Sequence, residues 1–239
     1  MLIHADVRSL EVVCAGFLSQ DPVLTAELHE NKNNPQKDDL HTNNQKQFNL
    51  PDRVTAKRFT FKLLYGGTDY GFSIDPKFNH VSKKRQYWSN VIEKFYSKYK
   101  GISQWHTRLV QDVLRDGQLV MPTGRAYTFP RLDVAQREWF WRPKILNYPV
   151  QGLGADLVAI GRVSMWKRLR KANIPVLFQS TVHDSIDIDC ESCYTSRVVA
   201  IVKQAIEDIP TNFENIFGVP FNLPLSCETS VGPNLRDLK

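Results

Sequence analysis

Two aspartates lie at the ends of short apolar segments that are far apart in the sequence. Asp6 follows Leu2-Ile3-His4-Ala5, and Asp184 lies within Thr181-Val182-His183-Asp184-Ser185-Ile186. Taken singly, Asp6 could cap a following helix, and Asp184 could be an ordinary turn residue. Taken together, their carboxylates could converge on two Mg²⁺ ions about 3.5–4 Å apart, because Mg²⁺ needs only one or two carboxylates beside phosphate oxygens and water.

Between these aspartates, Arg53, Lys57, Phe61 and Tyr65 recur at intervals of four residues. On a helix this spacing gives one slowly turning stripe about 18 Å long. Cations suit phosphates, particularly near a helix N-terminus, and aromatic rings suit bases. The stripe could therefore bind a nucleoside triphosphate. The alternative is an amphipathic helix whose cations are solvated and whose aromatic rings face the core.

The flanking sequence predicts the elements that would position these residues. Hydrophobic spacing, proline and glycine indicate a strand at 2–5, helices at 9–18 and from Pro22, a polar loop at 29–39, and a helix from 49–52 to about 64. They then indicate helical structure at 82–117, a hairpin at 118–130, a helix at 148–171 entered through Pro149, strands at 176–181 and 185–189, a helix at 197–208 and a strand at 223–229. Aromatic residues at 87–99 could stack on bases, but their helical spacing favours core packing.

Composition bounds the class of protein. The chain has 239 residues, enough for one or two domains, and a formal charge of +6 suits a nucleic-acid partner. Cys190-x2-Cys193 lacks a second half, which disfavours a zinc site. No apolar run reaches the roughly 18 residues that span a bilayer, and Met1–Asp6 does not resemble a signal peptide. The sequence therefore predicts a soluble, cytoplasmic protein without a membrane partner.

The ordered motifs resemble the polymerase part of family A DNA polymerases, especially those of bacteriophages. The family's Asp-Tyr-Ser-Gln-Ile-Glu-Leu-Arg stands here as Asp6 to Val13, its Arg-x3-Lys-x3-Phe-x3-Tyr-Gly as Arg53 to Gly66, and its Val-His-Asp-Glu as Val182 to Ser185. Lesser matches occur in order at Asp39-Leu40-His41-Thr42, Tyr99-x-Gly101-Ile102, Thr123-Gly124-Arg125, Asn147-x-Pro149-x-Gln151-Gly152 and Val231-Gly232-Pro233-Asn234. The resemblance covers nearly the whole chain.

The resemblance implies a catalytic set of Asp6, Asp184 and Lys57. The two aspartates and the backbone carbonyl of Val7 would hold two Mg²⁺ ions, which Mn²⁺ could replace. Lys57 would neutralise developing charge on the phosphates. The implied nucleotide-binding residues are Arg53, Lys57, Phe61, Tyr65, Glu11 and His41. The implied DNA-binding residues are Arg125, Asn147, Gln151 and His183.

Within that set, Arg53 and His41 would contact phosphates, and Phe61 would pack on the incoming sugar and base. Tyr65 would lie at the template side of the new base pair. Glu11 would act as a steric gate against a ribose 2′-hydroxyl, so deoxynucleotides are the expected substrates. Phe61, where some relatives carry Tyr, predicts discrimination against dideoxynucleotides.

The chain also departs from the family pattern. Ser185 replaces a Glu, Val13 an Arg, Lys62 a small residue and Leu235 a Trp. The first motif lies at the start of the sequence, where the family would have a thumb and often an exonuclease domain before it. Because a thumb grips DNA through phosphate contacts, we expect either a separate N-terminal chain that carries a thumb or a longer polypeptide.

The predicted fold is α/β (α+β), with an antiparallel palm sheet and flanking helices from residues 1–28 and 119–239, and helical fingers from residues 29–118. The predicted function is template-directed addition of deoxynucleotides to a primer 3′-end by two-metal nucleotidyl transfer, with primer–template DNA and dNTPs as partners. The alternative is a catalytically incompetent polymerase-derived subunit that binds DNA or a partner protein. A single-subunit RNA polymerase is a more distant alternative, disfavoured by Glu11 and by the Tyr65-Gly66 ending.

Overall fold

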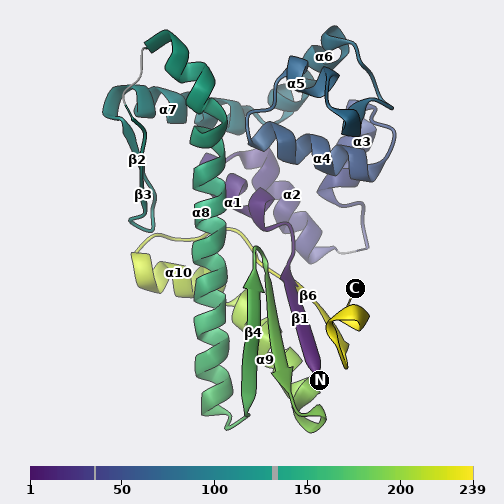
Figure 1. Ribbon diagram of the computed structural model, residues 1–239, viewed down its shortest axis with the longest axis vertical. Coiled ribbons are helices and arrows are strands. Elements are labelled where there is room, and N and C mark those ends of the chain that lie inside the picture. The colour runs from purple at the N-terminus through teal and green to yellow at the C-terminus, as the bar shows by residue number, and fades with distance from the viewer. Residues whose placement is uncertain (35, 131–133, 239) are drawn as a thin grey trace. The chain divides into compact units, whose positions relative to one another are not determined.

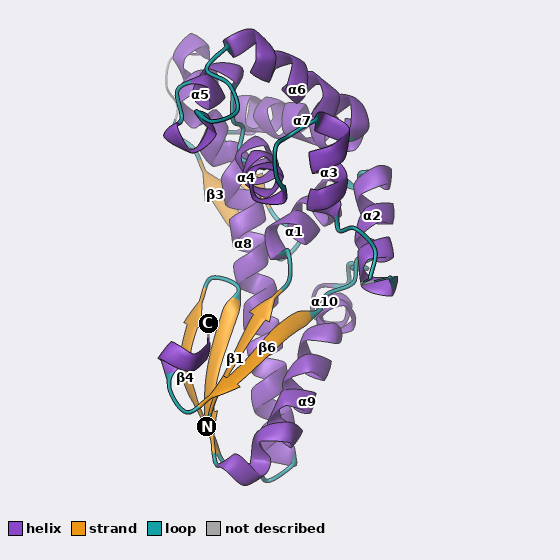
Figure 2. Ribbon diagram, turned by 90° about the vertical axis from the view of Figure 1, so that its right-hand side faces the viewer, coloured by secondary structure: helices purple, strands orange, loops and turns teal. Residues whose placement is uncertain are grey.

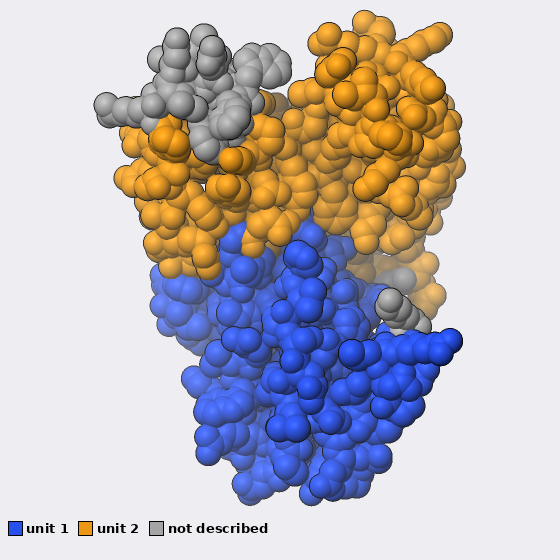
Figure 3. Space-filling view, viewed as in Figure 1, with its two compact units in different colours: residues 1–13, 152–239 blue, residues 14–151 orange. Residues whose placement is uncertain are grey.

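The computed structural model describes residues 1–34, 36–130 and 134–238, and these form two compact units. Unit 1 comprises residues 1–13 and 152–239, and unit 2 comprises residues 14–151 (Figure 3). The unit borders fall within helices α1 (Leu10–Ser19) and α8 (Val134–Lys171), so each of these helices contributes residues to both units. The predicted borders between palm and fingers, after residues 28 and 118, remain a prediction.

Unit 1 is built on a four-stranded antiparallel sheet. Its strands are β1 (Leu2–Val7), β4 (Val176–Val182), β5 (Ser185–Cys190) and β6 (Cys227–Gly232), in the order β4-β5-β1-β6 (Figure 1). Strand β1 is therefore central, paired with β5 on one side and β6 on the other. This arrangement confirms the predicted antiparallel sheet with flanking helices.

The side chains of β1 alternate between a buried and a half-buried face of the sheet. Ile3, Ala5 and Val7 are buried, whereas His4 and Asp6 are half-buried on the opposite face. Helix α9 (Thr195–Glu207) lies against β1 and β6, as Figure 2 shows, and α10 (Ile209–Phe217) follows it. An added Cβ on Gly161 of α8 would lie 3.0 Å from side-chain atoms of both Ile206 and Ile209, so a glycine allows α8 to pack closely here.

Unit 2 is largely helical. Its helices beyond α1 are α2 (Pro22–Asn33), α3 (Leu40–Phe48), α4 (Arg53–Leu64), α5 (Asp69–Ser73), α6 (Arg85–Lys98), α7 (Lys100–Asp116) and the first part of α8. Strands β2 (Gln118–Val120) and β3 (Ala126–Thr128) form the predicted hairpin. Single-turn 3₁₀ helices lie at Pro76–Phe78 in unit 2 and at Ser192–Tyr194 and Leu235–Leu238 in unit 1.

An aromatic core holds the helices of unit 2 together. Ring centroids within it lie 4.9 to 6.1 Å apart, distances typical of favourable aromatic pairs. Its fully buried members are Phe48, Phe59, Phe72, Phe78, Trp88, Phe95 and Tyr99. The core-packing interpretation of residues 87–99 is thus confirmed for Trp88, Phe95 and Tyr99, whereas Tyr87 and Tyr96 are half-buried.

Three predicted boundaries were wrong. Residues 29–33 belong to α2 and not to a loop, and the helix ends only at Asn34, whose backbone N–H donates to the carbonyl oxygen of Glu30. Helix α8 begins at Val134, well before Tyr148, and continues through Pro143 and Pro149. Leu146 and Val150 are fully buried beside Pro149, so apolar packing outweighs the usual cost of an internal proline. The last strand comprises residues 227–232 and not 223–229. Its bounds are set by backbone pairing with β1, which the apolar content of the sequence does not show.

Among the described residues, no helix is both long and apolar enough to cross a lipid bilayer. The four cysteines are free thiols, of which Cys14 and Cys190 are buried and Cys193 is exposed.

Candidate active site

The hairpin between β4 and β5 brings Asp184 next to Asp6. Val182 pairs with Ser185, which leaves His183 and Asp184 as a two-residue turn, and His183 has a φ of 53°. Asp6 pairs with Ser185 across β1 and β5. The backbone N–H of Val7 donates to the carbonyl oxygen of Asp184 at 2.9 Å. Asp6 is thus a strand residue and not a helix cap, and the two predicted carboxylates come from adjacent backbone positions.

Ser185 supports this turn. Its hydroxyl donates to the carbonyl oxygen of Val182 at 2.9 Å, and the residue is buried. On the other side of Asp6, the register partner is Glu228 of β6. One row across the sheet therefore contains Ser185, Asp6 and Glu228, with the hydroxyl engaged in the turn.

The donor chemistry at Asp6, Val7 and Asp184 fits Mg²⁺. Two carboxylates and a backbone carbonyl are hard oxygen ligands, and Mg²⁺ commonly completes its shell with substrate phosphate oxygens and water. Within the described ranges, no group of three or more His, Cys, Asp or Glu side chains is placed to hold a metal ion.

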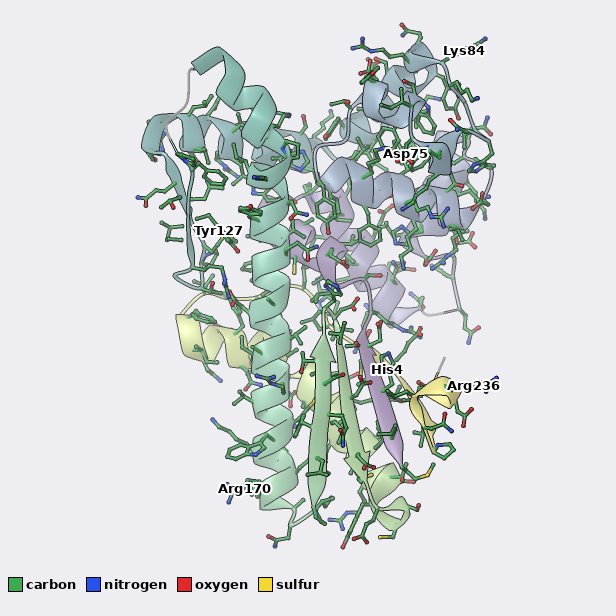
Figure 4. All side chains as sticks on the ribbon, in the orientation of Figure 1. His4, Asp75, Lys84, Tyr127, Arg170 and Arg236 are labelled. Atoms are coloured by element: carbon green, nitrogen blue, oxygen red, sulfur yellow. The ribbon has the colours of Figure 1, made fainter. Side chains whose placement is uncertain are left out.

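A partly buried hydrogen-bonded pair, His4 and Asp187, lies on the same face of the sheet as Asp6. His4, labelled in Figure 4 on β1, has its Nδ1 2.7 Å from Asp187 Oδ1, and Ser180 donates to the other oxygen of Asp187. Burial acts to raise the pKa of Asp187, but hydrogen bonds from Ser180 and His4 outweigh it and lower that pKa. These contacts tie β1, β4 and β5 together beside the aspartates.

In unit 2, helix α4 presents the predicted stripe away from the core. Arg53 and Lys57 are exposed, and Phe61 and Tyr65 are half-buried. The opposite face of the helix carries the buried residues Thr55, Ala56, Phe59, Thr60, Leu63 and Leu64. Asp52 caps the helix by accepting from the Thr55 N–H at 2.8 Å. The stripe is therefore not part of the core, as its nucleotide-binding interpretation requires.

Arg53 is held by a carboxylate that the sequence interpretation gave no role. Its Nε lies 3.1 Å from each carboxylate oxygen of Asp39, and its Nη2 also donates to that carboxylate. Asp39 also caps α3 by accepting from Thr42. Burial acts to raise the pKa of Asp39, yet the Arg53 and Thr42 hydrogen bonds hold it well below its ordinary value. The Asp-x-x-Thr spacing signals the cap, but nothing local signals the pairing with Arg53.

His41 of α3 is buried next to Phe61 of the stripe. It is only 3% exposed, its ring centroid lies 5.8 Å from that of Phe61, and its buried Nδ1 has no hydrogen-bond partner among the described residues. Burial lowers the pKa of His41 to about 4; Asp39 opposes that shift, and Arg53 and Lys57 add to it. The imidazole is thus neutral at pH 7. The Lys57 ammonium lies 5.7 Å from the centroid of Phe61.

The predicted DNA-binding residues of unit 2 lie on α8 and on the hairpin. The Gln151 side-chain amide donates to the Tyr65 hydroxyl at 2.6 Å, which joins the end of α4 to α8. Asn147 is half-buried one turn earlier on α8. Arg125 is exposed between β2 and β3, where its carbonyl accepts from the Met121 N–H at 2.8 Å.

The structure thus groups the predicted residues into two sets. Unit 1 contains Asp6, Val7, Glu11, His183 and Asp184, with Glu11 in the first turn of α1. Unit 2 contains the rest of the set, which is His41, Arg53, Lys57, Phe61, Tyr65, Arg125, Asn147 and Gln151.

The relatives found by comparison with known proteins include DNA polymerase I of several bacteria. The chain is 22% identical over 233 residues to the DNA polymerase I of Aquifex aeolicus, covering 90% of this chain and 38% of that protein. It is 25% identical over 255 residues to the thermostable DNA polymerase I of Thermus filiformis, covering 100% of this chain and 27% of that protein. The DNA polymerase I of Lactococcus lactis strain MG1363 is 28% identical over 194 residues, or 79% of this chain and 20% of that protein.

Among solved structures, the fold is similar to the POL domain of Pol1 from M. smegmatis in complex with DNA primer-template and dNTP. The TM-score is 0.81 at 18% identity, over 99% of this chain and 40% of that one. The chain thus spans well under half the length of these relatives. The model of the family described as DNA polymerase family A matches residues 1–237, and this chain therefore belongs to that family.

Proposed function

We propose that this chain carries out template-directed DNA synthesis by adding deoxynucleotides to a primer 3′-end. The observation that carries the proposal is the placement of Asp6 and Asp184 side by side by the β1–β5 pairing, in a chain that belongs to DNA polymerase family A. A mere binding module has no need for two adjacent carboxylates of this kind. The primer–template DNA and dNTP in the M. smegmatis structure indicate the corresponding partners for this chain.

Asp6, Asp184 and the carbonyl of Val7 would hold two Mg²⁺ ions, or Mn²⁺ in their place. Such ions lower the pKa of an attacking hydroxyl and stabilise charge on a transferring phosphoryl group. The two carboxylates therefore serve to fix where the reacting phosphate lies. Lys57 neutralises charge that develops on the phosphates, and Arg53 contacts the outer phosphates while Asp39 orients its guanidinium.

The remaining residues select and align the substrates. Glu11 excludes a ribose 2′-hydroxyl, and Phe61 packs on the incoming sugar and base. Since His41 is neutral, it acts on phosphates as a hydrogen-bonding group and not as a cation.

For the DNA, Tyr65 lies at the template side while bonded to Gln151. Arg125, Asn147, Gln151 and His183 contact primer–template DNA. A thumb, on a separate N-terminal chain or on an extension of this one, would strengthen the grip on the duplex.

Primer extension by the protein in its native assembly tests this function. We expect Mg²⁺-dependent incorporation of dNTPs that Asp6→Ala and Asp184→Ala each reduce roughly a thousand-fold, because metal-based charge stabilisation is worth several kcal/mol. Asp189→Asn is the matched control: it alters a carboxylate on β5 that bonds the terminal amine at 3.2 Å, and it should retain activity. Binding of primer–template without any extension by the unaltered protein would instead favour the incompetent-subunit alternative.

A further inference from the structure

Arg8 follows directly after the proposed metal ligands Asp6 and Val7. Its backbone N–H donates to the carbonyl oxygen of Ser226 at 3.0 Å, which fixes the main chain of Arg8 beside β6. Its Nη2 lies 2.6 Å from Oε1 of Glu228, the residue that pairs with Asp6 across β1 and β6. Glu228 therefore holds the guanidinium at β6, the strand that pairs with Asp6.

Arg8 and Asp6 are close enough in the chain for one polyphosphate to reach both. Arg8 is two residues beyond Asp6 and directly follows the end of β1 at Val7. Two residues of chain span at most about 7 Å, and a diphosphate together with an arginine side chain can cover that length.

The ion pair itself is easily exchanged. The Arg8 and Glu228 side chains are 53% and 64% exposed, and exposed ion pairs of this kind contribute little to stability. A phosphate offers more negative charge than a carboxylate and accepts two parallel hydrogen bonds from a guanidinium. Arg8 can therefore leave Glu228 for a phosphate without disturbing the fold.

We infer that Arg8 binds the phosphates of the incoming nucleotide that become the leaving diphosphate, with Glu228 holding the guanidinium when no phosphate is bound. The inference rests on the proposed function, since it is the metal site at Asp6 and Asp184 that would bring these phosphates within reach of Arg8. Glu228 also favours release of the product, because it competes with the diphosphate for the same guanidinium.

Single-nucleotide incorporation kinetics test this role. Arg8→Ala should raise the KM for dNTP roughly 10- to 100-fold, the effect expected for loss of a charge-assisted hydrogen bond, with a smaller change in kcat. Arg8→Lys should recover part of that loss, and Glu228→Gln should lower the KM because Arg8 is freed. Arg236→Ala, an exposed cation elsewhere in unit 1, is the matched control and should leave the KM unchanged.

A binding measurement separates failure of this inference from failure of the proposed function. Calorimetric titration of pyrophosphate with Mg²⁺ into the unaltered protein and into Arg8→Ala needs no catalysis, and weaker binding to Arg8→Ala supports the inference. Equal pyrophosphate affinity, or an unchanged KM in an active Arg8→Ala enzyme, overturns it. A common loss of thermal stability in Arg8→Ala and Glu228→Gln with no change in KM would show a purely structural pair and would also overturn it.

Discussion

The two cations on helix α4 differ in the contacts that a bound phosphate would have to replace. Arg53 already donates several hydrogen bonds to Asp39. Among the described residues, Lys57 forms no ion pair and lies beside the Phe61 ring. A phosphate at Arg53 must compete with Asp39 for the guanidinium or share it with Asp39. The Lys57 ammonium could bind a phosphate without first breaking an ion pair with any described residue. If both residues bind phosphate as proposed, Lys57 is therefore the more available of the two.

A third cation, Lys98 of α6, is buried and serves the fold. Its side chain is 8% exposed, its ammonium lies 2.7 Å from Glu27 Oε1, and it donates to Asn44 at 2.8 Å. The Tyr99 hydroxyl donates to Glu27 at 2.6 Å. Burial, followed by the charge of Glu27, raises the pKa of Tyr99 far above its ordinary value. Helices α2, α3 and α6 thus meet at one charged network.

At this site Lys98→Met should destabilise the protein by about 3–5 kcal/mol, because it removes the cation that neutralises the largely buried Glu27 carboxylate and leaves that carboxylate only the Tyr99 hydroxyl. The double variant Lys98→Met/Glu27→Gln should lose less than the single one, since no unpaired charge remains. Urea unfolding monitored by circular dichroism measures both. Lys94→Met, an exposed change on the same helix, is the control, and a Lys98→Met protein as stable as this control would contradict the prediction.

At the scale of the helices, the start of α7 packs closely against the cap of α2 in unit 2. Asp21 is fully buried; its Oδ1 accepts from Val23 and Leu24, and its Oδ2 accepts from the Gly101 N–H at 2.7 Å. A Cβ on Gly101 would lie 2.7 Å from the Asp21 Cα. Only glycine therefore allows α7 to begin at this distance from α2.

We expect Gly101→Ala to destabilise the protein by about 1–3 kcal/mol, the usual cost of overpacking a rigid site. Gly71→Ala in α5 is the matched control: its nearest neighbour would be the Thr68 hydroxyl at 3.2 Å, and alanine favours helix, so its effect should stay within about 1 kcal/mol of zero. Thermal unfolding of both variants gives the comparison. Equal melting temperatures would show that the backbone near Asp21 can move aside.

These examples show which features local sequence can specify. Spacing of four residues predicted that Arg53, Lys57 and Phe61 share one side of a helix, as they do on α4. The continuation of α8 through Pro149 depends on the burial of Leu146 and Val150. That burial comes from tertiary packing and cannot be predicted from the neighbouring residues in the sequence. Likewise, Arg53 with Asp39 and Arg8 with Glu228 join distant segments, so only the folded chain reveals them.

For the whole molecule, two buried histidines set the response to acid. Burial, with Arg142 as a second cause, lowers the pKa of His106 to about 3, and that of His41 is about 4. In the unfolded chain both titrate near 6.5. Between pH 6.5 and about 4 the unfolded state therefore binds more protons than the folded state, so stability is full above pH 6.5 and falls as the pH decreases through this range.

We accordingly expect a lower urea midpoint at pH 5 than at pH 7.5, and a smaller difference between these two pH values in His106→Gln. Asp39, whose pKa is lowered, contributes only in more acid solution and cannot produce a loss at pH 5. Equilibrium unfolding at the two pH values measures the effect. Equal pH dependence of His106→Gln and the unaltered protein would contradict the assignment to this histidine.

The central place of β1 has a consequence for the order in which the protein is made. Residues 14–151 form unit 2 from one continuous stretch, whereas β1 must wait for strands that are synthesised much later: His4 and Asp187 are 183 residues apart. Contacts between residues so far apart in sequence form slowly, and until they form the unpaired β1 can pair with strands of other chains. Unit 2 can therefore fold on the ribosome while the carboxylate pair is still unformed, and Asp6 reaches its final neighbours only after translation has passed β6.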